Sequence, residues 1–207
     1  MNSDKNPLEE MPENDASDEA FELNDRSKLT ANDYGKSYLI LFLLSGGILL
    51  LDQISKNWIR TNLAPYETWM PVDWLAPFVR IVNLENTGAA FGLFKQGGGL
   101  FTVLAIIVSL VIISYFPRIP NRDWFIRLSL GMQLGGALGN LFDRLFYGPV
   151  TDFVAVGSFP VFNVADSSIF VGTGILIFGV WLSERNEKLA RLKGTPETHD
   201  LEVGEQA

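Results

Sequence analysis

A short part of this otherwise apolar chain is rich in polar side chains. The stretch Gly139–Ser167, GNLFDRLFYGPVTDFVAVGSFPVFNVADS, holds three aspartates, two asparagines and an arginine: Asp143, Asp152, Asp166, Asn140, Asn163 and Arg144. Two carboxyl groups that lie a few ångströms apart cannot both ionise easily, so one keeps a proton while the other can act as a base on water. Acid–base hydrolysis is therefore the chemistry that this stretch could perform.

The rest of the composition excludes several other kinds of catalysis. The chain has no cysteine, which rules out thiolate metal sites and cysteine nucleophiles. Its single histidine, His199, lies in the polar C-terminal segment, so a Ser-His-Asp triad is not expected. Chemistry must then depend on carboxylates, amides, hydroxyls and water, and we expect neither a metal nor a cofactor.

Asp152 and Asp166 each have a plain structural explanation when taken singly. Asp152, in GPVTDF, is a common residue type for a turn or surface loop. Asp166 precedes SSIFVGTGILIFGVWL, where an aspartate often caps the start of a helix. Taken together, one lies on the loop that leaves the third apolar segment and the other opens the fourth. The Gly148–Pro149 turn lets the chain fold back, so the two carboxyl groups can meet and activate a shared water.

The polar residues around this pair leave two interpretations open. Asn140, Asp143 and Arg144 are spaced i, i+3, i+4 and share one helix face, where they could support a reaction or simply form an Asp143–Arg144 network between helices. Asp52 could belong to the site, or it could only pair with Lys56 one turn later, a contact worth about 0.2–0.5 kcal/mol on an exposed helix.

Four apolar segments are long enough to position these residues in a membrane, which takes about 20 helical residues, and fewer where side chains at the helix ends snorkel. They are Tyr38–Trp58, Leu100–Phe116, Trp124–Phe146 and Asp166–Leu182. In the third, Gly131, Gly135 and Gly139 recur every four residues, a pattern typical of close helix packing. The sequence thus predicts a small bundle of four transmembrane helices.

Basic residues predict how the bundle is oriented. They lie in the connection between the second and third segments, before the first segment and after the last, which predicts that these surfaces and both termini are in the cytoplasm. The connections Ile59–Gly99 and Tyr147–Ala165 then face outward, although four basic residues, Lys56, Arg60, Arg80 and Lys95, make the asymmetry incomplete. Alternation from Phe78 predicts a short outward strand that ends near an Asn-Thr-Gly turn.

The two ends of the chain have a different composition from the bundle. Residues 1–36 carry ten acidic and four basic side chains, which accounts for most of the formal net charge of −8. We expect residues 1–36 to be a disordered acidic cytoplasmic tail, residues 37–185 to be the membrane domain, and residues 186–207 to be a polar cytoplasmic tail.

Five blocks of the sequence resemble the motif set of bacterial lipoprotein signal peptidase, the type II signal peptidase. They occur in the family's order: LDQISK (Leu51–Lys56), NTGAAFG (Asn86–Gly92), GALGNLFDR (Gly136–Arg144), VTDF (Val150–Phe153) and FNVADSSI (Phe162–Ile169). The resemblance covers roughly residues 38–185. It is specific as a set, although any single block would be weak.

The resemblance implies an all-α membrane protein of four transmembrane helices, with a small extracytoplasmic β-cradle and a loop helix in parts of Pro65–Gly92 and Gly148–Pro160. It further implies an aspartic endopeptidase of the inner membrane, with its active site near the outer face. Its substrates would be diacylglyceryl-modified prolipoproteins, from which it would remove the signal peptide by cleaving before the lipidated cysteine.

The resemblance also implies roles for single residues. Asp152 and Asp166 match the catalytic pair. Five further residues match polar positions that line the active site, namely Asp52, Asn86, Asn140, Arg144 and Asn163, and Asp143 matches a structural partner beside Arg144. The expected partners are the prolipoprotein substrates and membrane lipids, with no nucleic acid, and we expect a monomer.

Two other classes of membrane protein compete with this interpretation. A transporter or channel also places ionisable residues in its helices, but four segments without an internal repeat offer little for alternating access. A non-enzymatic scaffold would predict that Asp152 and Asp166 are dispensable.

Overall fold

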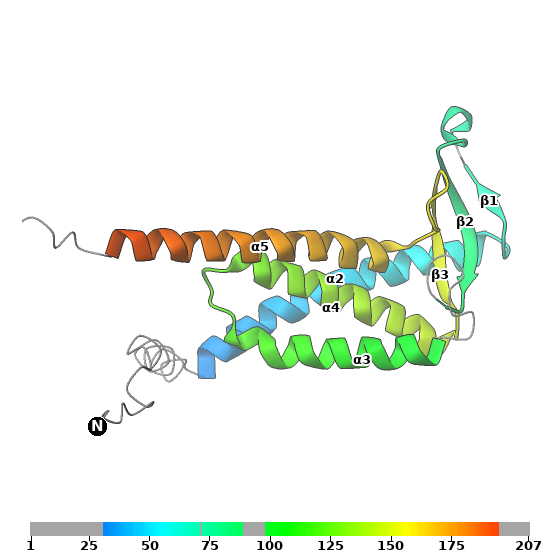
Figure 1. Cartoon of the computed structure of the whole chain (residues 1–207). Helices are drawn as coiled ribbons and strands as arrows, with labels where there is room; N and C mark the ends of the chain where they lie inside the picture. The colour runs from blue at the N-terminus through cyan, green and yellow to red at the C-terminus, as the bar shows by residue number, and fades with distance from the viewer. Residues whose placement is uncertain (1–30, 71, 89–97, 195–207) are drawn as a thin grey trace, which may run out of the picture.

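The computed structural model describes residues 31–70, 72–88 and 98–194. Four long helices run side by side, and a small sheet covers one end of their bundle (Figure 1). The helices are α2 (Ala31–Asn62), α3 (Gly98–Tyr115), α4 (Trp124–Phe146) and α5 (Val164–Gly194). The fold class predicted from the sequence is confirmed.

Three of the four helices are apolar enough to cross a membrane unaided. Among the described residues these spans are Gly35–Asn62, Gly98–Arg118 and Val164–Asn186. Helix α4 is less apolar because it packs against α2, α3 and α5 and buries eleven of its 23 residues. A helix enclosed by its neighbours has little surface facing lipid, so it can carry more polar side chains and glycines than they do.

The glycine face of α4 is confirmed as a helix contact, and its partner is α2. A Cβ built on Gly135 would lie 2.8 Å from Ile48 Cβ and 2.9 Å from the Ser45 carbonyl oxygen, and one on Gly139 would lie 2.6 Å from Asp52 Oδ2. Only a residue without a side chain allows the two backbones to approach so closely. Close packing brings the polar side chains of α2 and α4 within hydrogen-bonding distance of one another.

The sheet has three antiparallel strands in the order β1 (Thr68–Trp69), β2 (Val79–Asn86) and β3 (Val150–Val156). Strand β2 confirms the strand predicted from Phe78 onward, and it ends at Asn86. In the described part of Pro65–Gly92, where a loop helix was expected, there is a 3-10 turn, η1 (Asp73–Leu75), while residues 89–92 lie outside the described residues. In the register of β2 and β3, Asn86 pairs with Val150 and Leu84 with Asp152, which places the end of β2 beside the first residues of β3.

Two apolar clusters hold the two ends of the bundle. Leu41, Phe116 and Leu134 pack where α2, α4 and the 3-10 turn η3 (Phe116–Arg118) meet, and Ile59, Leu63 and Phe153 pack beneath the sheet. Many leucine, isoleucine and phenylalanine side chains of the helices instead point outward, as is expected of surfaces that face lipid.

The predicted tails lie largely outside the described residues. Helix α2 already begins at Ala31, within the segment expected to be disordered, and α5 continues to Gly194, beyond the predicted domain boundary at 185. Both of these helix ends lie at the end of the bundle opposite the sheet (Figure 1).

Candidate active site

Asp152 and Asp166 both lie at the sheet-covered end of the bundle. Asp152 is the third residue of β3 and is 1% exposed. Asp166 lies in the first turn of α5 and is partly exposed. The fold therefore brings together one aspartate from the connection between α4 and α5 and one from the first turn of α5.

Asn163 joins these two carboxyl groups. Its Nδ2 donates a hydrogen bond of 2.7 Å to Asp152 Oδ1, and its backbone N donates one of 3.3 Å to Asp166 Oδ2. The backbone N of Asp166 returns a 2.9 Å hydrogen bond to Asn163 Oδ1. This reciprocal pattern is a capping box, with Asn163 as the N-cap of α5 and Asp166 at the third helical position. The simple interpretation of Asp166 as the N-cap is wrong, because α5 begins two residues earlier, at Val164.

Two more asparagines complete the hydrogen bonding of the pair. Asn86, the last residue of β2, donates from Nδ2 to Asp152 Oδ2 at 2.8 Å. Asn140 of α4 donates from Nδ2 to Asp166 Oδ1 at 2.7 Å, and its own Oδ1 accepts a 3.1 Å bond from Asn163 Nδ2. Each carboxyl group thus accepts hydrogen bonds from two different asparagines, and together these bonds fix its orientation.

The surroundings of Asp152 favour its protonated form. Burial, followed by the neighbouring charge of Asp166, raises the pKa of Asp152 from 3.8 to about 7. The hydrogen bonds from Asn86 and Asn163 and the charge of Lys56 act in the opposite direction but are outweighed. A carboxyl group with a pKa near neutrality can both give and take a proton at physiological pH.

A buried lysine lies beneath the aspartate pair. Lys56 of α2 is fully buried, and its Nζ lies 2.8 Å from Asp52 Oδ2 and 3.0 Å from Asp143 Oδ2. It also donates a 3.0 Å hydrogen bond to Asn140 Oδ1. The expected Asp52–Lys56 pair is confirmed, but Lys56 does more than pair with Asp52. By binding Asn140 Oδ1, it orients the amide so that Nδ2 faces Asp166.

Asp52 also reaches the start of α5. Its Oδ1 accepts a 2.9 Å hydrogen bond from the backbone N of Ala165, a group that has no partner within the helix. An acidic side chain at a helix N-terminus is favourable, and this one fixes the first turn of α5 against α2. The first turn of α5 carries Asp166, so Asp52 helps to hold that residue in place.

Asp143 and Arg144 do not form the pair that their spacing suggested. Asp143 accepts from the backbone N of Thr151 at 3.1 Å and forms an ion pair with Arg60 at 3.4 Å, in addition to its contact with Lys56. Arg144 instead donates to the carbonyl oxygen of Asn140 at 3.3 Å, with its guanidinium 5.6 Å from the ring centre of Phe101. Adjacent helical residues point in different directions, so Asp143 faces α2 and β3 while Arg144 lies on another side of α4.

Sequence reasoning missed several members of this network. Gln53 donates from Nε2 to Asp143 Oδ1 at 3.1 Å, and Arg60 donates to Thr151 Oγ1 at 3.0 Å. From the sequence, Arg60 is interpreted only as an orientation signal and Lys56 only as that and as a partner of Asp52, yet an ionisable residue near the end of a membrane span is itself a signal of a buried partner. Within the described residues, no group of three or more His, Cys, Asp or Glu side chains could hold a metal ion.

Fold and site together define a class: a helical membrane protein that holds two carboxyl groups, joined through one asparagine, at one end of its bundle. The family described as signal peptidase (SPase) II matches residues 44–182. The chain belongs to the signal peptidase II family, and it is a membrane peptidase.

Individual relatives and solved structures agree with this assignment. The lipoprotein signal peptidase of Moorella thermoacetica is 41% identical over 145 residues, which are 70% of this chain and 93% of that protein. That of Xanthomonas campestris pv. campestris is 38% identical over 161 residues, 73% of this chain and 95% of that protein. A solved structure described as a bacterial membrane enzyme shares 27% identity and a TM-score of 0.61, covering 79% of this chain and 94% of its own. This similarity and the apolar helices indicate a bacterial membrane protein.

Proposed function

We propose that this chain is an aspartic endopeptidase that removes the signal peptide from diacylglyceryl-modified prolipoproteins, cleaving before the lipidated cysteine. The observation that carries the proposal is the pairing of Asp152 and Asp166 through Asn163, in which Asp152 has a pKa of about 7. Membership of the signal peptidase II family supports the removal of signal peptides. The names of the curated relatives, lipoprotein signal peptidases, support the substrate class.

In the proposed mechanism the two aspartates divide the acid and base roles. Asp166, the more exposed of the pair, takes a proton from a water molecule as that water attacks the scissile carbonyl carbon. Asp152 gives its proton to the carbonyl oxygen, and a tetrahedral diol forms. The diol then collapses: Asp166 passes its proton to the leaving amide nitrogen, and one hydroxyl returns a proton to Asp152. Both carboxyl groups regain their starting states, and no metal is required.

The remaining polar residues hold this arrangement in place. Asn86 and Asn140 orient one carboxyl group each, and Asp52 and Asp143 hold Lys56 beneath Asn140. Arg144, half-buried beside the pair, supplies a positive charge that can bind a carbonyl group of the substrate peptide.

The orientation of the chain follows the distribution of its basic residues. With both termini in the cytoplasm, the sheet and the aspartate pair lie near the outer face of the inner membrane. A substrate held there by its own signal helix and lipid reaches the pair sideways through the bilayer, without crossing water.

The test is a cleavage assay on a lipidated prolipoprotein peptide with protein purified in detergent. Asp152→Asn and Asp166→Asn should each reduce turnover by at least about a hundredfold, the usual contribution of one acid or base. Asp123→Asn is the matched control, because Asp123 precedes α4 at the opposite end of the bundle. A folded Asp152→Asn or Asp166→Asn protein that keeps most of its turnover would contradict the mechanism, because cleavage would then not depend on that carboxyl group.

A further inference from the structure

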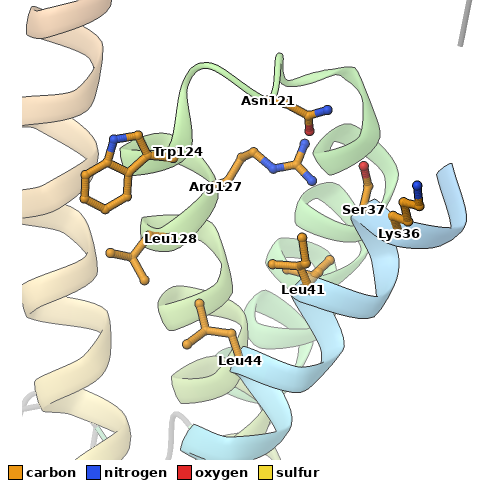
Figure 2. Close-up of a pocket in the computed structure, with 9 residues that line it drawn as sticks. Lys36, Ser37, Leu41, Leu44, Asn121, Trp124, Arg127 and Leu128 are labelled. Carbon is orange, nitrogen blue, oxygen red and sulfur yellow. The ribbon is translucent and has the colours of Figure 1, made fainter. Parts of the chain in front are cut away.

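A second polar site lies at the end of the bundle away from the aspartates. There a cavity of about 480 Å³ opens between the first turns of α2, the connection that follows η3, and the start of α4 (Figure 2). Its volume is within the usual range for pockets that bind small molecules. The proposed peptidase mechanism makes no use of it.

The polar part of this cavity is positively charged. Lys36 and Ser37 of α2 line it together with Asn121 and Arg127, and none of the described lining residues is acidic. Figure 2 shows the Arg127 guanidinium extending into the space between Asn121 and Ser37. Two cations, a hydroxyl and an amide therefore face one volume, a set of groups suited to an anion with several oxygens.

Arg127 has hydrogen-bonding capacity that the protein itself leaves unused. The side chain is 7% exposed, its Nη1 donates to the Ile119 carbonyl oxygen at 2.9 Å, and its guanidinium lies 4.5 Å from the ring centre of Phe116. Its Nη2 is buried, yet it has no hydrogen-bond partner among the described residues. A buried charged donor without an acceptor is costly, so an anionic oxygen placed there would be held firmly.

The remainder of the cavity wall is apolar. Ile40 and Leu44 lie one and two turns beyond Lys36 on α2, Leu128 lines the cavity from α4, and the exposed Trp124 lines it as well. Tryptophan is typical of the boundary between headgroups and hydrocarbon, which places the polar groups at headgroup level and the apolar wall at acyl-chain level. A free anion would contact only the polar groups of this cavity, whereas a lipid would contact both the polar groups and the apolar wall.

We propose that this cavity binds an anionic phospholipid, whose phosphate contacts Arg127 and Lys36 and whose acyl chain lies along Ile40, Leu44 and Leu128. In the proposed orientation the site faces the cytoplasmic leaflet, where the positive residues at the ends of membrane helices meet anionic headgroups. The bound lipid would stabilise the start of α4 against α2, independently of peptidase activity.

The experiment measures lipid binding through thermal unfolding of the full chain in a neutral detergent. Short-chain phosphatidylglycerol should raise the unfolding temperature with saturation, while phosphatidylcholine of the same chain length and glycerol 3-phosphate should not. Lys36→Gln should raise the half-saturating concentration of phosphatidylglycerol about fivefold, the usual effect of losing one basic residue near a headgroup. Asn121→Glu should raise this concentration at least as much, because it places an exposed negative charge in the cavity.

Arg118→Gln serves as the matched control, because Arg118 is an exposed cation at the same end of the bundle that does not line the cavity. It should leave the half-saturating concentration unchanged. Arg127 itself is not substituted, since its contacts with Ile119 and Phe116 also support the fold. The proposal would be overturned if phosphatidylcholine or glycerol 3-phosphate stabilised the protein as much as phosphatidylglycerol does. It would also be overturned if Lys36→Gln and Asn121→Glu bound phosphatidylglycerol as well as the wild type does.

Discussion

Asn163 performs two tasks with one side chain. Its Oδ1 caps α5 by accepting from the backbone N of Asp166, while its Nδ2 donates to Asp152 Oδ1. The same residue therefore ends the preceding connection, starts the helix and sets the separation of the proposed catalytic groups. A residue that can cap α5 but has no N–H to donate to Asp152 would separate these two tasks.

The two tasks of Asn163 can be tested with a pair of variants. Asn163→Ala should lower the free energy of unfolding by about 1 kcal/mol through loss of the cap, and should also lower turnover. Asn163→Ser keeps a capping oxygen but is too short to reach Asp152, so it should regain much of the stability and little of the turnover. Thermal unfolding and peptide cleavage of both variants provide the measurements. Recovery of full turnover by Asn163→Ser would mean that the Asp152 contact is unimportant.

The raised pKa of Asp152 has a consequence for stability. Because this pKa rises from 3.8 to about 7 in the folded protein, the folded state binds the proton more tightly than the unfolded state. Stability from this group is then present at low pH and lost as pH rises from about 4 to about 7. Asp152→Asn cannot ionise, so it should be more stable than the wild type at pH 8 and lose more than half of that advantage at pH 5. Unfolding temperatures of both proteins at the two pH values test this, and an equal difference at pH 5 and pH 8 would show that Asp152 is not perturbed.

At the scale of elements, the contact between α2 and α4 decides whether the polar network can form. Gly131, Gly135 and Gly139 allow the approach, and Asp52, Lys56 and Asp143 occupy the space that results. Removing one partner of a buried ion pair leaves an unpaired charge. The glycines and the charged residues of these two helices therefore depend on each other.

Gly135→Leu tests this dependence. The new side chain would collide with Ile48 and with the backbone of Ser45, so it should destabilise the protein by about 1–3 kcal/mol, as overpacking usually does. Gly47→Leu is the matched control, because a Cβ at Gly47 meets nothing within 4 Å. Thermal unfolding in detergent compares the two variants. Equal melting of Gly135→Leu and wild type would contradict the close packing of α2 against α4.

The elements were easier to predict from the sequence than their contacts. Apolar segment length was enough to identify four helices, and residue alternation identified β2. The partners of Asp143 could not be foreseen, because helical spacing shows which residues share a face but not which neighbouring element that face meets. The capping role of Asn163 was missed for a related reason: the start of α5 was placed at Asp166, and the N-cap is defined by the helix boundary itself. Lys56 escaped notice as a central residue because its burial depends on how α2 packs against α4.

At the scale of the whole molecule, the position of the site bears on what the enzyme recognises. The aspartate pair lies at one end of a bundle whose sides are apolar, so a substrate anchored by lipid is already concentrated at the right level. Each acyl CH₂ group contributes about 0.8 kcal/mol to membrane association, so two chains would outweigh a few hydrogen bonds to asparagines.

This leads to a direct comparison of substrates. One prolipoprotein, with and without its diacylglyceryl group, is reconstituted with the enzyme in the same bilayer, where the signal helix anchors both forms. The lipidated form should be cleaved faster, and the difference in initial rates is the measurement. Equal rates would show that the lipid is not recognised and that peptide residues around the cleavage site set specificity.

The order of the elements along the chain has a consequence for biosynthesis. Asn163 and Asp166 lie at the start of α5, the last of the four helices, while their partners Asn86, Asn140 and Asp152 come earlier. A ribosome that has delivered α2, α3 and α4 to the translocon has supplied only one of the two proposed catalytic carboxyl groups. Under the proposed mechanism, the newly made peptidase stays inactive until its final helix has entered the bilayer, and a partly inserted chain cannot cut a neighbouring nascent protein.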